Sequence, residues 1–267
     1  MSLTRLSVVI LNRNLGDVCD SLVADLKLRG VNDIFVVDAS SSPSLRSKNA
    51  TLTPKDPGII SKGLRINRGY NLGLGQAIAN SKADWVLCLP VDTEIDAFHF
   101  EKLLVQLQQY PSVVAVCPLE TNSPYLSLVP ESGLGIAWKI PEGPIFLQSD
   151  FVRVFQEGDR VRIFDDENFR GYLSFVELAL RIYGNNKAFG VSSLIQVHER
   201  EDYLLNFSDL MKTEPLEINK YLLVTEGISW LKEKYGLVDR WSFENMARLV
   251  FEDFVSKNPR ESEIAIH

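Results

Sequence analysis

Cysteine and histidine are scarce in this sequence, and the cysteines do not form a metal-binding pattern. The 267 residues include three of each, and Cys19, Cys88 and Cys117 lack the spacing of a zinc site. Cys88 and Cys117 lie inside apolar runs, as buried and reduced cysteines do. We therefore expect a cytoplasmic protein.

Long apolar runs and excess positive charge are also missing. No run approaches the roughly 18 apolar residues that span a bilayer, and the first residues do not resemble a signal peptide. This predicts no transmembrane segment and leaves peripheral contact with a membrane open. The formal net charge of −7, without clustered Lys and Arg, argues against a nucleic-acid partner.

What the sequence does contain is short apolar strands that alternate with amphipathic helices. Residues 6–11 form a β-branched run that ends in N-R-N, from Asn12 to Asn14, and residues 33–37 form another that leads into Asp38. A helix is expected between them. A right-handed crossover puts the ends of both strands on the same edge of a sheet, so we expect Asn12 and Asp38 to be neighbours.

The stretch from Asn67 to Asp92 is the most informative. It predicts a glycine-punctuated turn, an Ala-rich helix to about Ser81, and an apolar strand from Trp85 to Leu89. Open α/β sheets bind ligands beyond the carboxyl ends of their strands. Asp92 is therefore well placed to meet a metal ion or a polyphosphate.

The remaining elements complete an α/β fold. Beyond Asp92 we predict helices over 96–110, 148–155, 175–183, 218–235 and 243–255, and strands over 113–116, 145–147 and 188–197. Residues 43–62 and 120–144 are expected to be long loops. We expect a mostly parallel sheet flanked by helices over residues 1–203, with a C-terminal helical extension, 204–267, packed on the same domain.

Several of these segments, in this order, resemble the sequence blocks of glycosyltransferase family 2. They are S-V-V-I-L-N-R-N, I-F-V-V-D-A-S-S-S, N-L-G-L-G-Q-A-I-A-N-S-K-A-D-W-V-L-C-L-P-V-D-T-E-I, F-D-D-E-N-F-R-G-Y-L-S-F-V-E-L-A-L-R and Val197-His198. The rhamnosyltransferase-like branch is the most similar. The resemblance implies the Rossmann-like GT-A fold and transfer of a sugar from a nucleotide-diphosphate donor to a glycan, lipid-linked or other hydroxyl acceptor. It also implies inversion, Mg²⁺ or Mn²⁺ as cofactor, and polysaccharide biosynthesis.

The resemblance further implies which residues hold the donor. Asn12 and Asn14 would line the nucleoside pocket, and Asp38 would accept hydrogen bonds from the base or the ribose. Asn71 and Gly73 match the family's Asn-x-Gly turn beside the nucleotide.

The metal ligands follow from the same resemblance. Asp92 matches the last Asp of the family's metal-binding Asp-x-Asp motif, and His198 matches a histidine that can complete the metal shell. A divalent cation held there would stabilise the negative charge that develops on the diphosphate leaving group.

The sequence departs from the family at two points. Pro90 stands where the metal motif often has its first Asp or an Asn. Ser174 and Phe175 stand where the family has the Glu-Asp pair that supplies the catalytic base, and neither can be a base. The nearby carboxylates that remain as candidates are Glu177, Asp165, Asp166 and Glu167.

The alternative to a glycosyltransferase is a non-catalytic module that binds nucleotide or glycan, or a scaffold for another transferase.

Simpler roles fit several of these residues. Asp92 could belong to a strand-end turn or cap the helix after it, and Asp38 could form an Asx-turn with the serines that follow. His198 could be a structural histidine at a strand end. Glu177 fits a salt bridge on a helix better than it fits a base.

Overall fold

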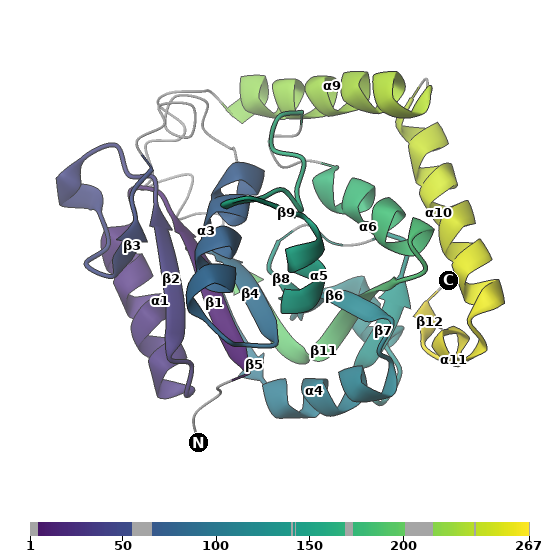
Figure 1. Cartoon of the computed structure of the whole chain (residues 1–267), viewed down its shortest axis with the longest axis horizontal. Helices are drawn as coiled ribbons and strands as arrows, with labels where there is room; N and C mark the ends of the chain where they lie inside the picture. Colours follow the sequence, from purple (N-terminus) through teal and green to yellow (C-terminus); the bar gives the residue numbers. More distant parts are fainter. Residues whose placement is uncertain are drawn as a thin grey trace.

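The computed structural model describes residues 5–54, 66–139, 141, 143–168, 173–200, 216–237 and 239–266, and for residues 216–224 and 226 it describes the backbone only. These residues form a large mixed sheet flanked by helices (Figure 1). The α/β prediction of a mostly parallel, GT-A-type sheet is confirmed.

The strands follow the chain in this order: β1 Leu6–Asn12, β2 Asp33–Asp38, β3 Ala50–Leu52, β4 Trp85–Pro90, β5 Thr93–Phe98, β6 Val113–Glu120, β7 Leu134–Ala137, β8 Ile145–Gln148, β9 Gln156–Glu157, β10 Arg160–Val161, β11 Ala188–Glu199 and β12 Ala265–Ile266. Their order in the large sheet is β12-β7-β11-β6-β8-β4-β1-β2-β3, with β5 paired to β11 beside it. β9 and β10 form a separate hairpin.

The helices are α1 Gly16–Leu28, α3 Ile66–Asn80, α4 Phe100–Gln109, α5 Ser149–Val154, α6 Ser174–Gly184, α9 Leu216–Tyr235, α10 Arg240–Lys257 and α11 Pro259–Ser262. Two short 3₁₀ turns, η1 Pro43–Leu45 and η2 Pro124–Ser127, lie in the connections.

The N-terminal half of the sheet is parallel. β1 pairs with β2 on one side and with β4 on the other, and β3 extends the sheet beyond β2. β1 and β4 are buried along almost their whole length, as central strands of a parallel sheet are. Their apolar runs made both strands predictable.

The other half of the sheet is mixed. β8 runs antiparallel between β4 and β6, so β6 points in the same direction as β4. β11 is parallel to β6 and antiparallel to β5 and β7. The carboxyl ends of β1, β4, β6 and β11 therefore share one edge of the sheet.

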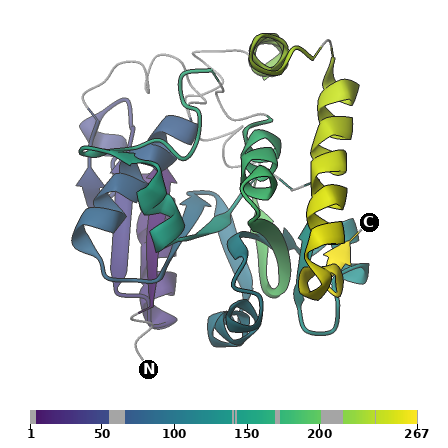
Figure 2. The same cartoon turned by 45° about the vertical axis from the view of Figure 1, so that its right-hand side comes forward.

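The C-terminal segment is built into the same core. α10 lies beside α6 (Figure 2), and Tyr183 of α6 packs against the rings of Phe251 and Phe254. β12 pairs with β7 and adds a strand to the sheet. The predicted extension thus contributes a strand as well as helices, while its expected boundary at 203/204 lies outside the described residues.

Four local predictions are wrong. Residues 96–98 end β5 instead of starting a helix, and burial alternates along the strand from Thr93 to Asp96, which is the two-residue period of a strand. β3 and β7 lie inside segments that were expected to be loops. The predicted turn at residues 67–75 is part of α3.

The helices among the described residues are too short or too polar to cross a bilayer.

Candidate functional site

The chain reverses its course through the sheet between β1 and β4. It passes from β1 to β2 and β3 on one side, then returns to place β4 on the other side of β1. A switch point of this kind leaves a crevice beyond the carboxyl ends of the two strands, where open α/β sheets bind ligands. Asn12 ends β1, and residues 90–92 lie at the corresponding end of β4.

Asn12 and Asp38 belong to one buried hydrogen-bond network. Asn12 Nδ2 donates to Asp38 Oδ2 at 2.8 Å, and the backbone N–H groups of Ser40 and Ser47 donate to the same carboxylate at 2.9 and 2.8 Å. Asp38 is 0% exposed. The expectation that Asn12 and Asp38 are neighbours is confirmed, and the Asx-turn with Ser40 is present. Direct contact between Asp38 and a nucleoside would require this network to open.

Asn14 fastens the turn after β1 to the segment after β2. Its φ of 62° lies in the left-handed region, which asparagine tolerates better than most residues. Its Oδ1 accepts hydrogen bonds from the backbone N–H and the hydroxyl of Ser41 at 2.7 and 3.1 Å. Its own N–H donates to Ser40 Oγ at 3.0 Å. The two strand ends are therefore held in a fixed relation.

Asn71 and Gly73 lie within α3 and not in a turn. Asn71 Nδ2 donates to the carbonyl oxygen of Phe164 at 2.8 Å, and Asn71 Oδ1 accepts from the Phe164 N–H at 3.1 Å. A Cβ on Gly73 would lie 2.2 Å from Val9 Cγ1. Gly73 therefore allows α3 to pack closely against β1. The glycines of this stretch predicted a turn, and their spacing does not indicate that one of them is required for helix packing.

Asp92 and His198 come from two chain segments that meet where β5 pairs with β11. The Asp92 carbonyl accepts the N–H of Arg200 at 3.0 Å, and His198 lies opposite Glu94 in the antiparallel register. Asp92 is 4% exposed, whereas His198 is exposed. Both residues lie at the edge of the sheet that also carries Asn12 and Asp38.

Glu177 is an ion-paired residue of the interior. Its side chain is 1% exposed and accepts hydrogen bonds from Arg181 at 2.9 Å, from Lys234 Nζ at 2.8 Å and from the Tyr235 hydroxyl at 2.9 Å. Burial by itself would raise the pKa of Glu177, but the charges of Arg181 and Lys234 outweigh it and hold the pKa below its usual value. A carboxylate with a lowered pKa is a weak base, so these contacts favour the salt-bridge role.

Asp166 and Glu167 belong to a turn that Asp165 stabilises. Asp165 Oδ1 accepts the N–H groups of Glu167 and Asn168 at 3.3 and 3.0 Å, and Glu167 forms an ion pair with Arg162 at 3.4 Å. Asp166 and Glu167 line a cavity of about 430 Å³ between α3 and the β9–β10 hairpin. A second cavity, at the end of β6, is lined by other residues.

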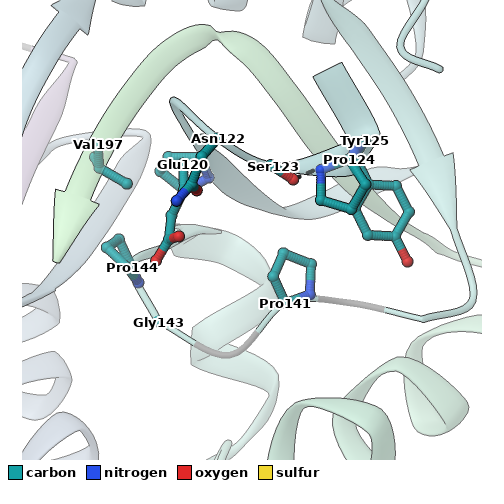
Figure 3. Close-up of a pocket in the computed structure, with 10 residues that line it drawn as sticks. Glu120, Asn122, Ser123, Pro124, Tyr125, Pro141, Gly143, Pro144 and Val197 are labelled. Carbon is teal, nitrogen blue, oxygen red and sulfur yellow. Dashed lines mark hydrogen bonds between the residues drawn. The ribbon is translucent and has the colours of Figure 1, made fainter. Parts of the chain in front are cut away.

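The cavity at the end of β6 has a volume of about 340 Å³. Glu120, the last residue of β6, lines it together with Asn122, Ser123, the Tyr125 ring and four prolines. In Figure 3 the Glu120 carboxylate is directed across the cavity towards the loop of Gly143 and Pro144. Glu120 was not among the predicted site residues, because the strand was expected to end at residue 116. β6 stays buried to residue 119, and this apolar continuation through a proline was the available signal.

A comparison with known protein families identifies the family of this chain. The sequence profile described as "Glycosyl transferase family 2" matches residues 7–141. The chain belongs to glycosyl transferase family 2. None of the curated proteins matches the chain. A solved structure described as "Crystal Structure of A197 from STIV" aligns with a TM-score of 0.42 and 13% identity, over 73% of this chain and 85% of its own.

Family 2 membership supports transferase activity in general. Ser174 and Phe175, the positions where the family's acidic pair was expected, lie beyond the matched segment. Ser174 and Phe175 are both 3% exposed. The Phe175 ring stacks on Phe164 at a centroid distance of 5.6 Å and packs against Phe189 at 6.5 Å. Phe175 is thus part of the aromatic core and cannot accept a proton.

Asp92 and His198 lie on chain segments that meet at this edge, and they are the residues expected to hold the divalent cation that family 2 enzymes often use. Among the described residues, no three or more His, Cys, Asp or Glu side chains gather into a group that could hold a metal ion. Mg²⁺ is usually bound by one or two carboxylates together with phosphate oxygens of the substrate. Asp92 supplies one carboxylate of the kind that such a cation requires.

Proposed function

We propose that this family 2 protein transfers a sugar from a nucleotide-diphosphate donor to a hydroxyl group of a glycan or lipid-linked acceptor, with inversion at the anomeric carbon. A role in polysaccharide biosynthesis in the cytoplasm and the likeness to the rhamnosyltransferase-like branch belong to the same proposal. One observation carries it. β4, which leads into Asp92, pairs with β1 at the switch point of the sheet, within the segment that matches the family.

The contacts divide the predicted donor-site residues into those that shape the pocket and one that would contact the nucleoside. Asn12 and Asp38 are bonded to each other, and Asn71 and Gly73 fasten α3 to its neighbours. We assign these four residues the task of fixing the shape of the nucleotide pocket. Asn14, at the turn after β1, would line the nucleoside.

Asp92 and His198 would hold Mg²⁺ or Mn²⁺ against the diphosphate. When bound, the cation would offset the negative charge on the leaving group, which a protein of net charge −7 otherwise has little means to do. Asp92 is the residue on which this assignment can be tested most directly.

Calorimetric titration with UDP, dTDP and GDP, each with and without MnCl₂, tests the donor site. We expect Mn²⁺ to strengthen the binding of at least one nucleotide about tenfold or more, and Asp92→Asn to abolish that gain. Asp96→Asn is the matched control, because Asp96 is an exposed carboxylate on β5, the strand that follows Asp92. Failure of all three nucleotides to bind at millimolar concentration would overturn the proposal, as would Mn²⁺-dependent binding that Asp92→Asn leaves intact.

A non-catalytic nucleotide- or glycan-binding module is the second candidate, and the position of Phe175 in the core favours it. The two functions differ in turnover. Release of nucleoside diphosphate from UDP-glucose, dTDP-rhamnose or GDP-mannose by the wild-type chain supports the enzyme. Nucleotide binding without any release from these donors supports the binding module.

A further inference from the structure

Glu120 combines two features: it ends β6 at the functional edge of the sheet, and it lines the cavity there. It is exposed, and its carboxylate makes no hydrogen bond or ion pair with the residues that the structure describes. Glu177, in contrast, is held by two cations and a hydroxyl. Glu94, on the neighbouring β5, is paired with Arg200 at 2.7 Å.

The cavity around Glu120 lies at the same edge of the sheet as the proposed donor site. β6, β8 and β4 are neighbours in that order, and Ile145, which follows the cavity residue Pro144, pairs with Cys88 near the end of β4. Two strand spacings, about 10 Å, therefore separate the ends of β6 and β4. A sugar whose diphosphate lies near Asp92 could present its anomeric carbon to this cavity.

The walls of the cavity have the mixed character that a sugar requires. Prolines and the Tyr125 ring supply apolar surfaces, and Glu120, Asn122 and Ser123 supply polar groups on one side (Figure 3). The ring is fixed, because the Tyr125 hydroxyl donates to the Lys139 carbonyl at 2.8 Å. Hydroxyl edges and C–H faces of a pyranose match such an arrangement, in which a few polar groups orient a ligand between apolar walls.

We propose that this cavity is the acceptor subsite and that Glu120 is the catalytic base. The inference rests on the proposed function. The Glu120 carboxylate takes the proton of an acceptor hydroxyl while the hydroxyl oxygen forms a bond to the anomeric carbon of the donor. The bond from that carbon to the diphosphate oxygen breaks, and the nucleoside diphosphate leaves with the electron pair. Glu120 thereby fills the role that Ser174 and Phe175 cannot perform.

Turnover of UDP-glucose, dTDP-rhamnose and GDP-mannose tests the role of Glu120 as the base. Glu120→Gln should lower kcat for nucleoside diphosphate release about 100-fold or more, since a general base contributes on the order of 10²- to 10⁴-fold. Its affinity for nucleotide with Mn²⁺ should change less than twofold. Formate should restore part of the activity of Glu120→Ala, because a small carboxylate can enter the space that the side chain vacates. Glu131→Gln, an exposed carboxylate outside the cavity, should match the wild type.

Saturation-transfer NMR with methyl glycosides of glucose, galactose, mannose and rhamnose, in the presence of UDP and Mn²⁺, tests the subsite. Asn122→Trp should block the cavity and abolish the glycoside signal with nucleotide affinity unchanged, whereas Thr121→Trp, an exposed neighbour that does not line the cavity, should retain it.

The outcomes separate this inference from the proposed function. A wild type that turns over a donor, with Glu120→Gln equally active, overturns the base and leaves the transferase intact. Equal glycoside signals from Asn122→Trp and the wild type, or none from the wild type, overturn the subsite. A wild type that binds nucleotide but releases none overturns both the base and the transferase.

Discussion

At the ends of β1 and β2, Asn12, Asp38 and Ser40 are buried and bonded to one another, whereas at the end of β6 Glu120 is exposed and faces a cavity. Both groups of residues lie on the same edge of the sheet. The first group uses its hydrogen-bonding capacity to hold the chain in place, and the second leaves that capacity for a ligand. Substitutions should therefore affect stability in the first region and turnover in the second.

Asp38→Ala should produce the largest loss of stability. It removes a carboxylate that accepts three hydrogen bonds in a site without solvent access, and a buried donor left unsatisfied costs roughly 1–3 kcal/mol. We expect the free energy of unfolding, measured in urea, to fall by about 4 kcal/mol. Asp96→Ala, at an exposed position, is the control. A loss below about 1 kcal/mol would contradict a structural role for this network.

Glu177→Gln should follow, with a loss of about 3 kcal/mol, because it leaves Arg181 and Lys234 without their shared counter-charge. Glu167→Gln removes an exposed carboxylate with one long ion pair and should cost less than about 0.5 kcal/mol. Equal effects of the two substitutions would show that the buried ion pairs add no stability.

The contribution of Glu177 should also depend on pH. Its pKa is lower in the folded chain than the ordinary value of 4.5, so the folded state binds its proton less readily than the unfolded state does. The stabilisation is present above the ordinary pKa and is lost as the pH falls through the folded pKa. The stability difference between the wild type and Glu177→Gln should therefore shrink below pH 4.5. A difference that stays constant down to pH 3 would refute this interpretation.

Gly73→Ala should cost about 2 kcal/mol, the usual effect of overpacking, because its Cβ would lie 2.2 Å from Val9 Cγ1 and 3.1 Å from Val37 Cγ2. Gly75→Ala is a matched control on the same helix. Its Cβ would meet only Asp159 O, at 3.7 Å, and the better helix propensity of alanine should stabilise the chain by up to about 0.8 kcal/mol. The same sign for both variants would argue against close packing of α3 on β1.

Glu120→Gln should have the smallest effect on stability, within about 0.5 kcal/mol of the wild type. Its carboxylate supports no contact among the described residues, so amide replacement removes nothing that the fold uses. Urea unfolding of this variant beside Asp38→Ala is the most direct measure of the contrast between the two regions. A loss comparable with that of Asp38→Ala would remove the contrast.

The elements that could be predicted from the sequence are those whose apolar residues follow a regular spacing within the element. β1, β2 and β4 are apolar runs with clear ends, and α4 and α6 show helical spacing of apolar residues. The segment from Thr93 to Phe98 was missed because a strand at the side of a sheet keeps polar residues on alternate positions. The two-residue β12 was missed because it depends entirely on pairing with β7.

The same distinction applies to the site. Asn12, Asp38, Asp92 and His198 could be placed on one edge because strand direction alone determines their position. Whether Asp38 or Glu177 is open to a ligand depends on partners outside the strand or helix that carries it, such as Ser47 and Lys234. Those contacts leave no local pattern. Glu120 is different, because the apolar run of β6 continues through Pro118 and was a local signal for it.

The large sheet ends on both sides in very short strands, β3 with three residues and β12 with two. An open strand edge invites other chains to add to it, and short edge strands are one of the devices that prevent aggregation. β12 covers one side of β7, whose residues Leu134–Ala137 are all buried. Loss of β12 would therefore expose the apolar edge of β7, and it should lead to self-association of the chain before it leads to unfolding.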